Sequence, residues 1–330
     1  MTWPPPWPDE GWFADIALHG GRTALFGTHL GLDQVTGWMP PLYWATLRVW
    51  FGLVGTGLWQ QRALSVVCAL LATWALWRLA VRWGPPGWTA LLVWCLPSWW
   101  RSTLMGRPDM MCLALMLWCY ALTGWRSGLA GGLALCVHPM AAPVLLRGLW
   151  SSRWRTWCLA AAVPLGIWGV YVLVTGPDLW YHQWAAQMGR KWVGGNLPPW
   201  ARLAWMDPIV MGMAVLGLAY APARRWLLLG LLGAVTVYLG GERWYPVYLV
   251  PVAVLGLGRA VWGHPWRRWL LTGWAVLSLL MVWRVLRTES VEIPDHYREM
   301  WLPSYIKGGT VPDPYWYVPD TELLRYEPPI

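Results

Sequence analysis

Long apolar runs separated by short polar segments dominate this chain. Several runs hold almost no charged residue and approach the ~20 residues that a helix needs to cross a bilayer. The expected spans are 61–82, 87–103, 109–124, 156–175, 206–221, 226–240, 246–262 and 269–286. The pattern therefore predicts an all-α polytopic membrane protein, a bundle of about 9–10 transmembrane or re-entrant helices with interfacial helices on the outer side.

Two apolar segments do not fit a simple span. Residues 40–58 contain Arg48, so this segment is either a short span or a helix that lies in the membrane interface. Residues 128–149 are rich in glycine and are interrupted by His138-Pro139 and by Pro143. Irregular backbone at membrane depth must be buried in protein or line a cavity, so we expect a re-entrant pair of half-helices here.

Composition agrees with a membrane protein and excludes other classes. Hydrophobic residues make up 57% of the chain and charged residues 12%, against about 25% charged residues in soluble domains. The net charge of +9 comes largely from arginines between apolar segments, where they orient the spans, so membrane lipids are expected around the chain and nucleic acid is not a partner. The six cysteines lie in apolar runs without metal-ligand spacing, and no organic cofactor is expected.

Arginine placement predicts the orientation. Cytoplasmic loops carry an excess of basic residues, and an extracytoplasmic N-terminus places ten arginines inside: Arg78, Arg82, Arg126, Arg147, Arg153, Arg155, Arg224, Arg225, Arg267 and Arg268. Three regions follow. Residues 1–60 form an extracytoplasmic acidic-pair loop and a juxtamembrane helix, residues 61–286 form the transmembrane bundle with an outer loop at 176–205, and residues 287–330 form an extracytoplasmic tail.

Candidate chemistry gathers on the predicted outer side. An adjacent acidic pair, Asp9-Glu10, precedes the first span, and the short loop "GRPDM" carries Arg107 and Asp109. Basic residues on this side work against the positive-inside rule, which favours a specific role such as holding an anion. They are Arg62, Arg101, Arg107, Arg190 and Arg243. Carboxylates act as general bases or hold a metal, and arginines bind phosphate through two oxygens, so the combination suits a lipid-phosphate substrate.

Each feature also has a common structural explanation. An acidic pair in a polar loop is usually solvated, and a single arginine such as Arg62 or Arg101 often reaches toward the interface. Arg107 would then pair with Asp109 across a tight turn, and Glu242 with Arg243. Only the joint placement on one predicted side favours a site.

An ordered set of motifs resembles the C-type membrane glycosyltransferases (GT-C), in particular the bacterial branch similar to aminoarabinose and protein O-mannosyl transferases. The matching stretches are, in order, "PDEGWFADIALHGG", "MPPLYWATLRVWFGLVG", "QRALSVVCALLA", "RSTLMGRPDMMCLALML" and "ERWYPVYLVPVAVL". The resemblance covers residues 1–125 well and 150–262 loosely.

The resemblance implies a multi-pass enzyme of the bacterial inner membrane whose active site faces outward. It would be an inverting glycosyltransferase that moves a sugar from a polyprenyl-phosphate carrier to an acceptor hydroxyl on a lipid, a glycan or a protein. Asp9 matches the catalytic base, Glu10 would support it, and Asp109 matches a second acidic position near the acceptor or a metal. Both metal-dependent and metal-independent catalysis stay open, with Asp9, Glu10 and Asp109 able to hold one divalent ion. The residues expected to bind substrate are Arg62, Arg107, Arg243, Tyr245, Arg190 and His182.

The chain departs from the family in two respects. The family normally has a large C-terminal soluble domain, and residues 287–330 are too short to form one. The family also normally has a span before the acidic pair. Either a span is missing or a partner subunit supplies it. Two other functions therefore stay open: a non-catalytic membrane subunit of a larger complex derived from this fold, and a lipid or solute transporter.

Overall fold

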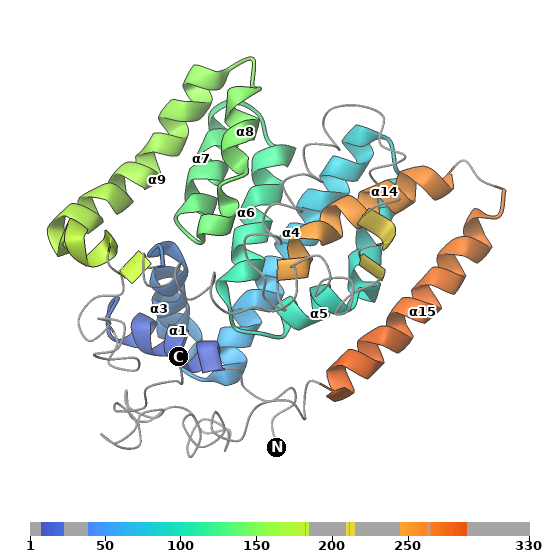
Figure 1. The fold of residues 1–330 in the computed structure, drawn as a ribbon, viewed down its shortest axis with the longest axis horizontal. Coiled ribbons are helices and arrows are strands. Elements are labelled where there is room, and N and C mark those ends of the chain that lie inside the picture. Colours follow the sequence, from blue (N-terminus) through green and yellow to red (C-terminus); the bar gives the residue numbers. More distant parts are fainter. Residues whose placement is uncertain are drawn as a thin grey trace.

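The computed structural model describes residues 8–22, 39–181, 183–184, 209–210, 212–214, 245–262 and 265–288. Within these ranges the chain is helical and contains no strand. The helices are α1 (Pro8–Leu18), α3 (Leu42–Val54), α4 (Leu58–Trp83), η1 (Gly87–Cys95), α5 (Pro97–Thr103), α6 (Pro108–Ala121), α7 (Gly124–Leu135), η2 (Pro139–Ala141), α8 (Val144–Leu149), α9 (Trp154–Thr175), η3 (Tyr245–Leu249), α14 (Val250–Trp262) and α15 (Arg267–Thr288). Figure 1 shows α4 crossing the middle of the bundle, with α9 and α15 at opposite margins.

Two described helices, α4 and α9, are long and apolar enough to cross a membrane by length and composition. They correspond to the expected spans 61–82 and 156–175. The two differ in their surroundings: 56% of the most apolar stretch of α4 is buried in the protein, against 11% for α9. Helix α15 covers the expected span 269–286 as one continuous helix.

The expected span 87–103 is wrong as a single helix. The chain forms the 3₁₀ helix η1, becomes extended at Leu96 (φ −102°, ψ 131°) and then begins α5 at Pro97. The cause is local, because a residue that precedes proline is driven out of the helical region. Residues 246–262 are likewise divided into η3 and α14, and the span expected at 109–124 already ends at Ala121. Most of the expected spans 206–221 and 226–240 lies outside the described residues.

The interruption predicted near His138-Pro139 is confirmed. Helix α7 ends at Leu135, the single turn η2 follows, and α8 begins at Val144. The break leaves the carbonyl of Cys136 available to another segment, and the backbone N–H of Leu42 donates to it at 2.9 Å. The first residue of α3 is therefore anchored by the end of α7. With only 13 residues, α3 is too short to cross a hydrocarbon core of about 30 Å at ~1.5 Å per residue.

Helices α7 and α9 approach closely because α7 lacks side chains where they meet. A Cβ on Gly128 would collide with the carbonyl oxygen of Trp157, and a Cβ on Gly132 would lie 2.5 Å from the carbonyl oxygen of Ala161. The two glycines are four residues apart, the spacing that lets membrane helices pack backbone to backbone. The Ser127 hydroxyl completes the contact, since it accepts from Trp157 Nε1 at 3.2 Å.

Candidate functional site

The acidic pair lies on a helix, which corrects the expectation of a loop. Helix α1 begins at Pro8, so Asp9 and Glu10 occupy its first turn, where a negative charge is favoured by the helix dipole. Proline at the first position of a helix and acidic residues beside it are a common N-terminal pattern. The side chain of Asp9 lies outside the described residues. The side chain of Glu10 is not solvated as a loop carboxylate would be, because its exposed fraction is 0%.

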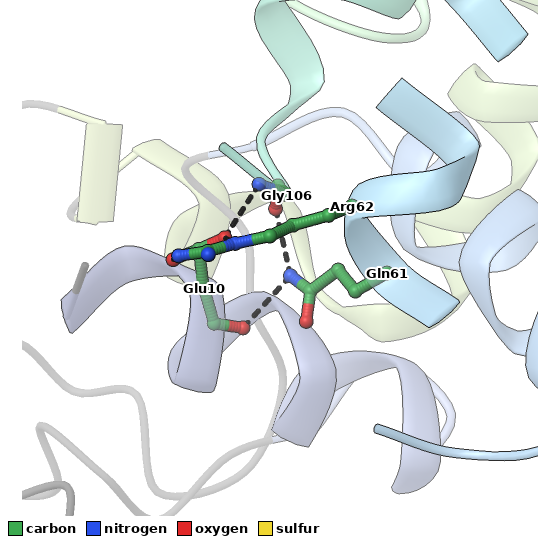
Figure 2. Close-up of polar contacts among 4 residues, drawn as sticks. All are labelled: Glu10, Gln61, Arg62 and Gly106. Atoms are coloured by element: carbon green, nitrogen blue, oxygen red, sulfur yellow. Dashed lines mark hydrogen bonds and ion pairs between the residues drawn. The ribbon is translucent and has the colours of Figure 1, made fainter. Parts of the chain in front are cut away.

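Glu10 forms a two-pronged ion pair with Arg62 at the start of α4. Arg62 donates through Nε to Oε1 and through Nη2 to Oε2, each at 2.8 Å. Oε1 also accepts the backbone N–H of Gly106 at 2.7 Å. Figure 2 shows the guanidinium and the carboxylate facing one another, with Gly106 beside them. Both charged side chains are buried, so their charges are compensated by each other and by a backbone dipole rather than by water.

Gln61 on α4 contacts the backbone of both α1 and the turn that contains Gly106. Its Nε2 donates to the carbonyl oxygen of Glu10 at 2.9 Å and to the carbonyl oxygen of Gly106 at 2.7 Å. The fit is tight, since a Cβ on Gly106 would lie 2.8 Å from Gln61 Cδ. We call Glu10, Gln61, Arg62 and Gly106 the buried junction. It joins α1 to α4 and to the turn that leads into α6.

Arg107 and Asp109 form the second charged pair next to this junction. Arg107 Nε donates to Asp109 Oδ2 at 3.0 Å, and both side chains are buried. The pairing of these two residues across a tight turn, one of the two explanations drawn from the sequence, is confirmed. Asp109 lies in the first turn of α6. Its other oxygen, Oδ1, is buried without a hydrogen-bond partner among the described residues, which makes it the carboxylate atom best suited to receive a ligand here.

Tyr43 on α3 is a neighbour of the acidic residues that sequence reasoning missed. Burial raises the pKa of its phenol, and the nearby carboxylates of Glu10 and Asp109 raise this pKa further. The hydroxyl is therefore a neutral group in the midst of the charged cluster. Its ring packs edge-on against Phe13 of α1, with the centroids 5.2 Å apart. The "PPLYWA" motif contained this tyrosine, but nothing in the motif distinguished it from an ordinary interfacial aromatic residue.

The structure brings together part of the predicted site. Its described members are carried by α1, α4 and the start of α6, which meet at one end of the bundle: Glu10, Arg62, Arg107 and Asp109. The remaining predicted residues are Arg190, His182 and Arg243, which lie outside the described residues, and Tyr245, which begins η3 with its side chain outside them. Their roles in binding substrate stay predictions.

A divalent ion held by Asp9, Glu10 and Asp109 also stays a prediction, and Glu10 fits that role poorly. Both of its oxygens already accept hydrogen bonds from nitrogen donors. Among the residues that the structure describes, no group of three His, Cys, Asp or Glu side chains is placed to hold a metal ion. A metal would have to be built on Asp109 Oδ1 and on groups beyond the described side chains.

The fold is similar to that of a membrane enzyme of known structure. The chain superimposes on the crystal structure of ArnT from Cupriavidus metallidurans in the apo state, an aminoarabinose transferase of the GT-C type. The TM-score is 0.55 at 17% identity, over 86% of this chain and 69% of ArnT. No protein-family model matches the chain, and no curated protein matches it in sequence. The likeness confirms the all-α GT-C-like fold that the ordered motifs indicated.

Proposed function

We propose that this chain is an inverting glycosyltransferase that takes a sugar from a polyprenyl-phosphate carrier. The acceptor is a hydroxyl group on the extracytoplasmic side of a bacterial inner membrane. The observation that carries the proposal is the GT-C-like fold combined with an acidic helix, α1, that is fixed by a buried ion pair. Such a fold supports a lipid-linked donor, and the acidic pair sits at a helix start rather than on a free loop.

In this proposal Asp9 removes the proton of the acceptor hydroxyl. The freed oxygen attacks the anomeric carbon of the sugar as the bond between that carbon and the carrier phosphate breaks. The carrier leaves as polyprenyl phosphate, and the configuration inverts because attack and departure occur on opposite faces of the sugar. Basic groups stabilise the charge that develops on the leaving phosphate, a role that we assign to Arg107, Arg190 and Arg243 with Tyr245 and His182.

Glu10 and Arg62 have a different task from the one that the sequence indicated. Arg62 was expected to bind the carrier phosphate, but its Nε and Nη2 atoms hold Glu10. We therefore propose that both act as positioning residues, which fix the first turn of α1 and with it Asp9. Preorganisation of this kind lowers the barrier because the base need not search for its geometry.

The test is the rate of transfer from a polyprenyl-phosphate sugar by purified protein. We expect Asp9→Asn to reduce turnover by about 100-fold or more, the usual contribution of a general base. Asp178→Asn is the matched control, because Asp178 is exposed and lies in the predicted outer segment 176–205; its turnover should be unchanged. Wild-type turnover in Asp9→Asn, with the protein folded, would remove Asp9 as the base.

A non-catalytic membrane subunit is the second candidate, and burial favours it. Glu10, Arg62 and Asp109 are all nearly inaccessible to solvent, as expected of residues that only hold helices together. Gentle purification distinguishes the two. A stoichiometric partner protein without any polyprenyl phosphate, detected by native mass spectrometry, would support the subunit, whereas donor-dependent turnover would exclude it.

A further inference from the structure

The far end of α4 carries a second group of arginines that the proposed reaction does not use. Arg78 and Arg82 follow Arg62 along the same helix, and Arg78 lies about 24 Å from it at ~1.5 Å per residue. This distance approaches the ~30 Å thickness of a hydrocarbon core. The two groups of arginines therefore lie at opposite ends of the bundle.

Three arginines at this far end share a cavity. Arg78 and Arg82 from α4 and Arg126 from α7 line an open cavity of about 400 Å³, together with Val81 and residues 121–123. None of the three forms an ion pair within the part of the chain that the structure describes. Tryptophan rings hold two of the guanidinium groups: Arg78 lies 5.7 Å from the ring centre of Trp118, and Arg126 lies 5.5 Å from that of Trp125. The cavity thus concentrates three positive charges without a carboxylate.

The backbone adds to the attraction for an anion. Helix α7 begins at Gly124, and its N-cap residue, Thr123, makes no side-chain capping bond. The first N–H groups of the helix are consequently not satisfied by a cap, and they lie beside the cavity that Thr123 lines. The N-terminus of a helix favours negative charge, and phosphate is a frequent ligand there when basic side chains are also present.

An apolar stripe on α4 leads directly to the cavity. Leu70, Trp74, Trp77 and Val81 are all exposed large hydrophobic residues, and their spacing places them on one face of the helix. Val81 itself lines the cavity. A ligand with a phosphate at one end and hydrocarbon chains at the other matches both parts.

We propose that this cavity binds the phosphate of an anionic phospholipid, with its acyl chains lying along the exposed stripe of α4. The arginines supply the charge, and the stripe selects a lipid over a free phosphate ion. Basic pockets between membrane helices are suited to such head groups. The site is separate from the buried junction and does not depend on the proposed transferase activity.

The test is binding of phosphatidylglycerol to the full chain in zwitterionic detergent, followed by native mass spectrometry and by thermal stabilisation. Phosphatidylcholine with the same acyl chains and inorganic phosphate are the comparison ligands. We expect saturable binding of phosphatidylglycerol that weakens about fivefold for Arg126→Gln and about a hundredfold for the Arg78→Gln/Arg82→Gln/Arg126→Gln variant.

Arg155→Gln is the matched control. Arg155 lies 5.5 Å from the ring centre of the preceding Trp154, just as Arg126 does with Trp125, but it does not line the cavity. Wild-type affinity in Arg155→Gln would support the site. Equal weakening in Arg155→Gln, equal binding of phosphatidylcholine, or unchanged affinity in the triple variant would overturn it. Binding of inorganic phosphate alone, with no gain from the lipid, would overturn the lipid assignment.

Discussion

Replacing Glu10 by glutamine removes one charge from the buried junction while nearly preserving the volume of the side chain. Glu10 accepts three hydrogen bonds, two from Arg62 at 2.8 Å and one from Gly106 at 2.7 Å. Glutamine has only one acceptor oxygen, so Arg62 is left as a buried charge without its counter-ion. Removing one partner of such a pair typically costs about 3–5 kcal/mol, and we expect Glu10→Gln to lower the free energy of unfolding by about that amount.

A double-mutant cycle separates charge pairing from general disturbance. Arg62→Gln should cost a similar amount, because it leaves Glu10 unpaired. The double variant removes both charges of this pair, so its cost should be smaller than the sum of the two single costs by ~2 kcal/mol. Reversible unfolding in mixed micelles, followed by tryptophan fluorescence, measures all four proteins. Additive costs, or no loss of stability in Glu10→Gln, would refute the view that this ion pair fixes α1.

Further substitutions test three other contacts. Gly106→Ala should lower the free energy of unfolding by about 1–3 kcal/mol, because the new methyl group displaces Gln61. Unchanged thermal stability would contradict the close packing of Gly106 against Gln61. Gly128→Ala should lower the free energy of unfolding by ~2 kcal/mol or more, because Gly128 lies where α7 meets α9. Gly166→Ala is the control: this position has open space, so the change should be neutral or stabilising by ~0.5–1 kcal/mol. Equal melting temperatures of the two variants would disprove the close approach of α7 and α9. The side-chain hydrogen bond with Asp15 raises the pKa of His19 above 6.5. The stability that this contact contributes is therefore fully present below pH 6.5 and is lost as the pH rises through the raised pKa. His19→Gln should flatten the pH dependence of the melting temperature in that range, and an identical profile in both proteins would exclude the contribution.

Local signals in the sequence predicted what short segments do. The lengths of α4 and α9 followed from apolar runs, and the interruption near His138 followed from proline. Two errors had local signals that were available. Pro8 followed by acidic residues is a helix start, and the residue before Pro97 is biased toward extended backbone.

The buried junction could not be predicted in this way. Glu10 and Gly106 are separated by 96 positions in the chain, and no periodicity connects them. In the sequence, a buried arginine that pairs with a carboxylate cannot be distinguished from an arginine that binds a phosphate ligand. Only the three-dimensional contact distinguishes the two cases. The sequence therefore predicts that Arg62 binds the carrier phosphate, whereas in the structure it pairs with Glu10.

The hydrogen bond from Leu42 to Cys136 has a consequence for how this fold can be recombined. The N–H of Leu42 has no partner within α3, and the carbonyl of Cys136 has none within α7, so the two groups satisfy each other. A chimera that exchanges residues 39–54 with a similar protein, but keeps residues 124–149, must preserve this meeting of two helix ends. The two segments must therefore be exchanged together, although residues 55–123, including all of α4 and α6, lie between them in the chain.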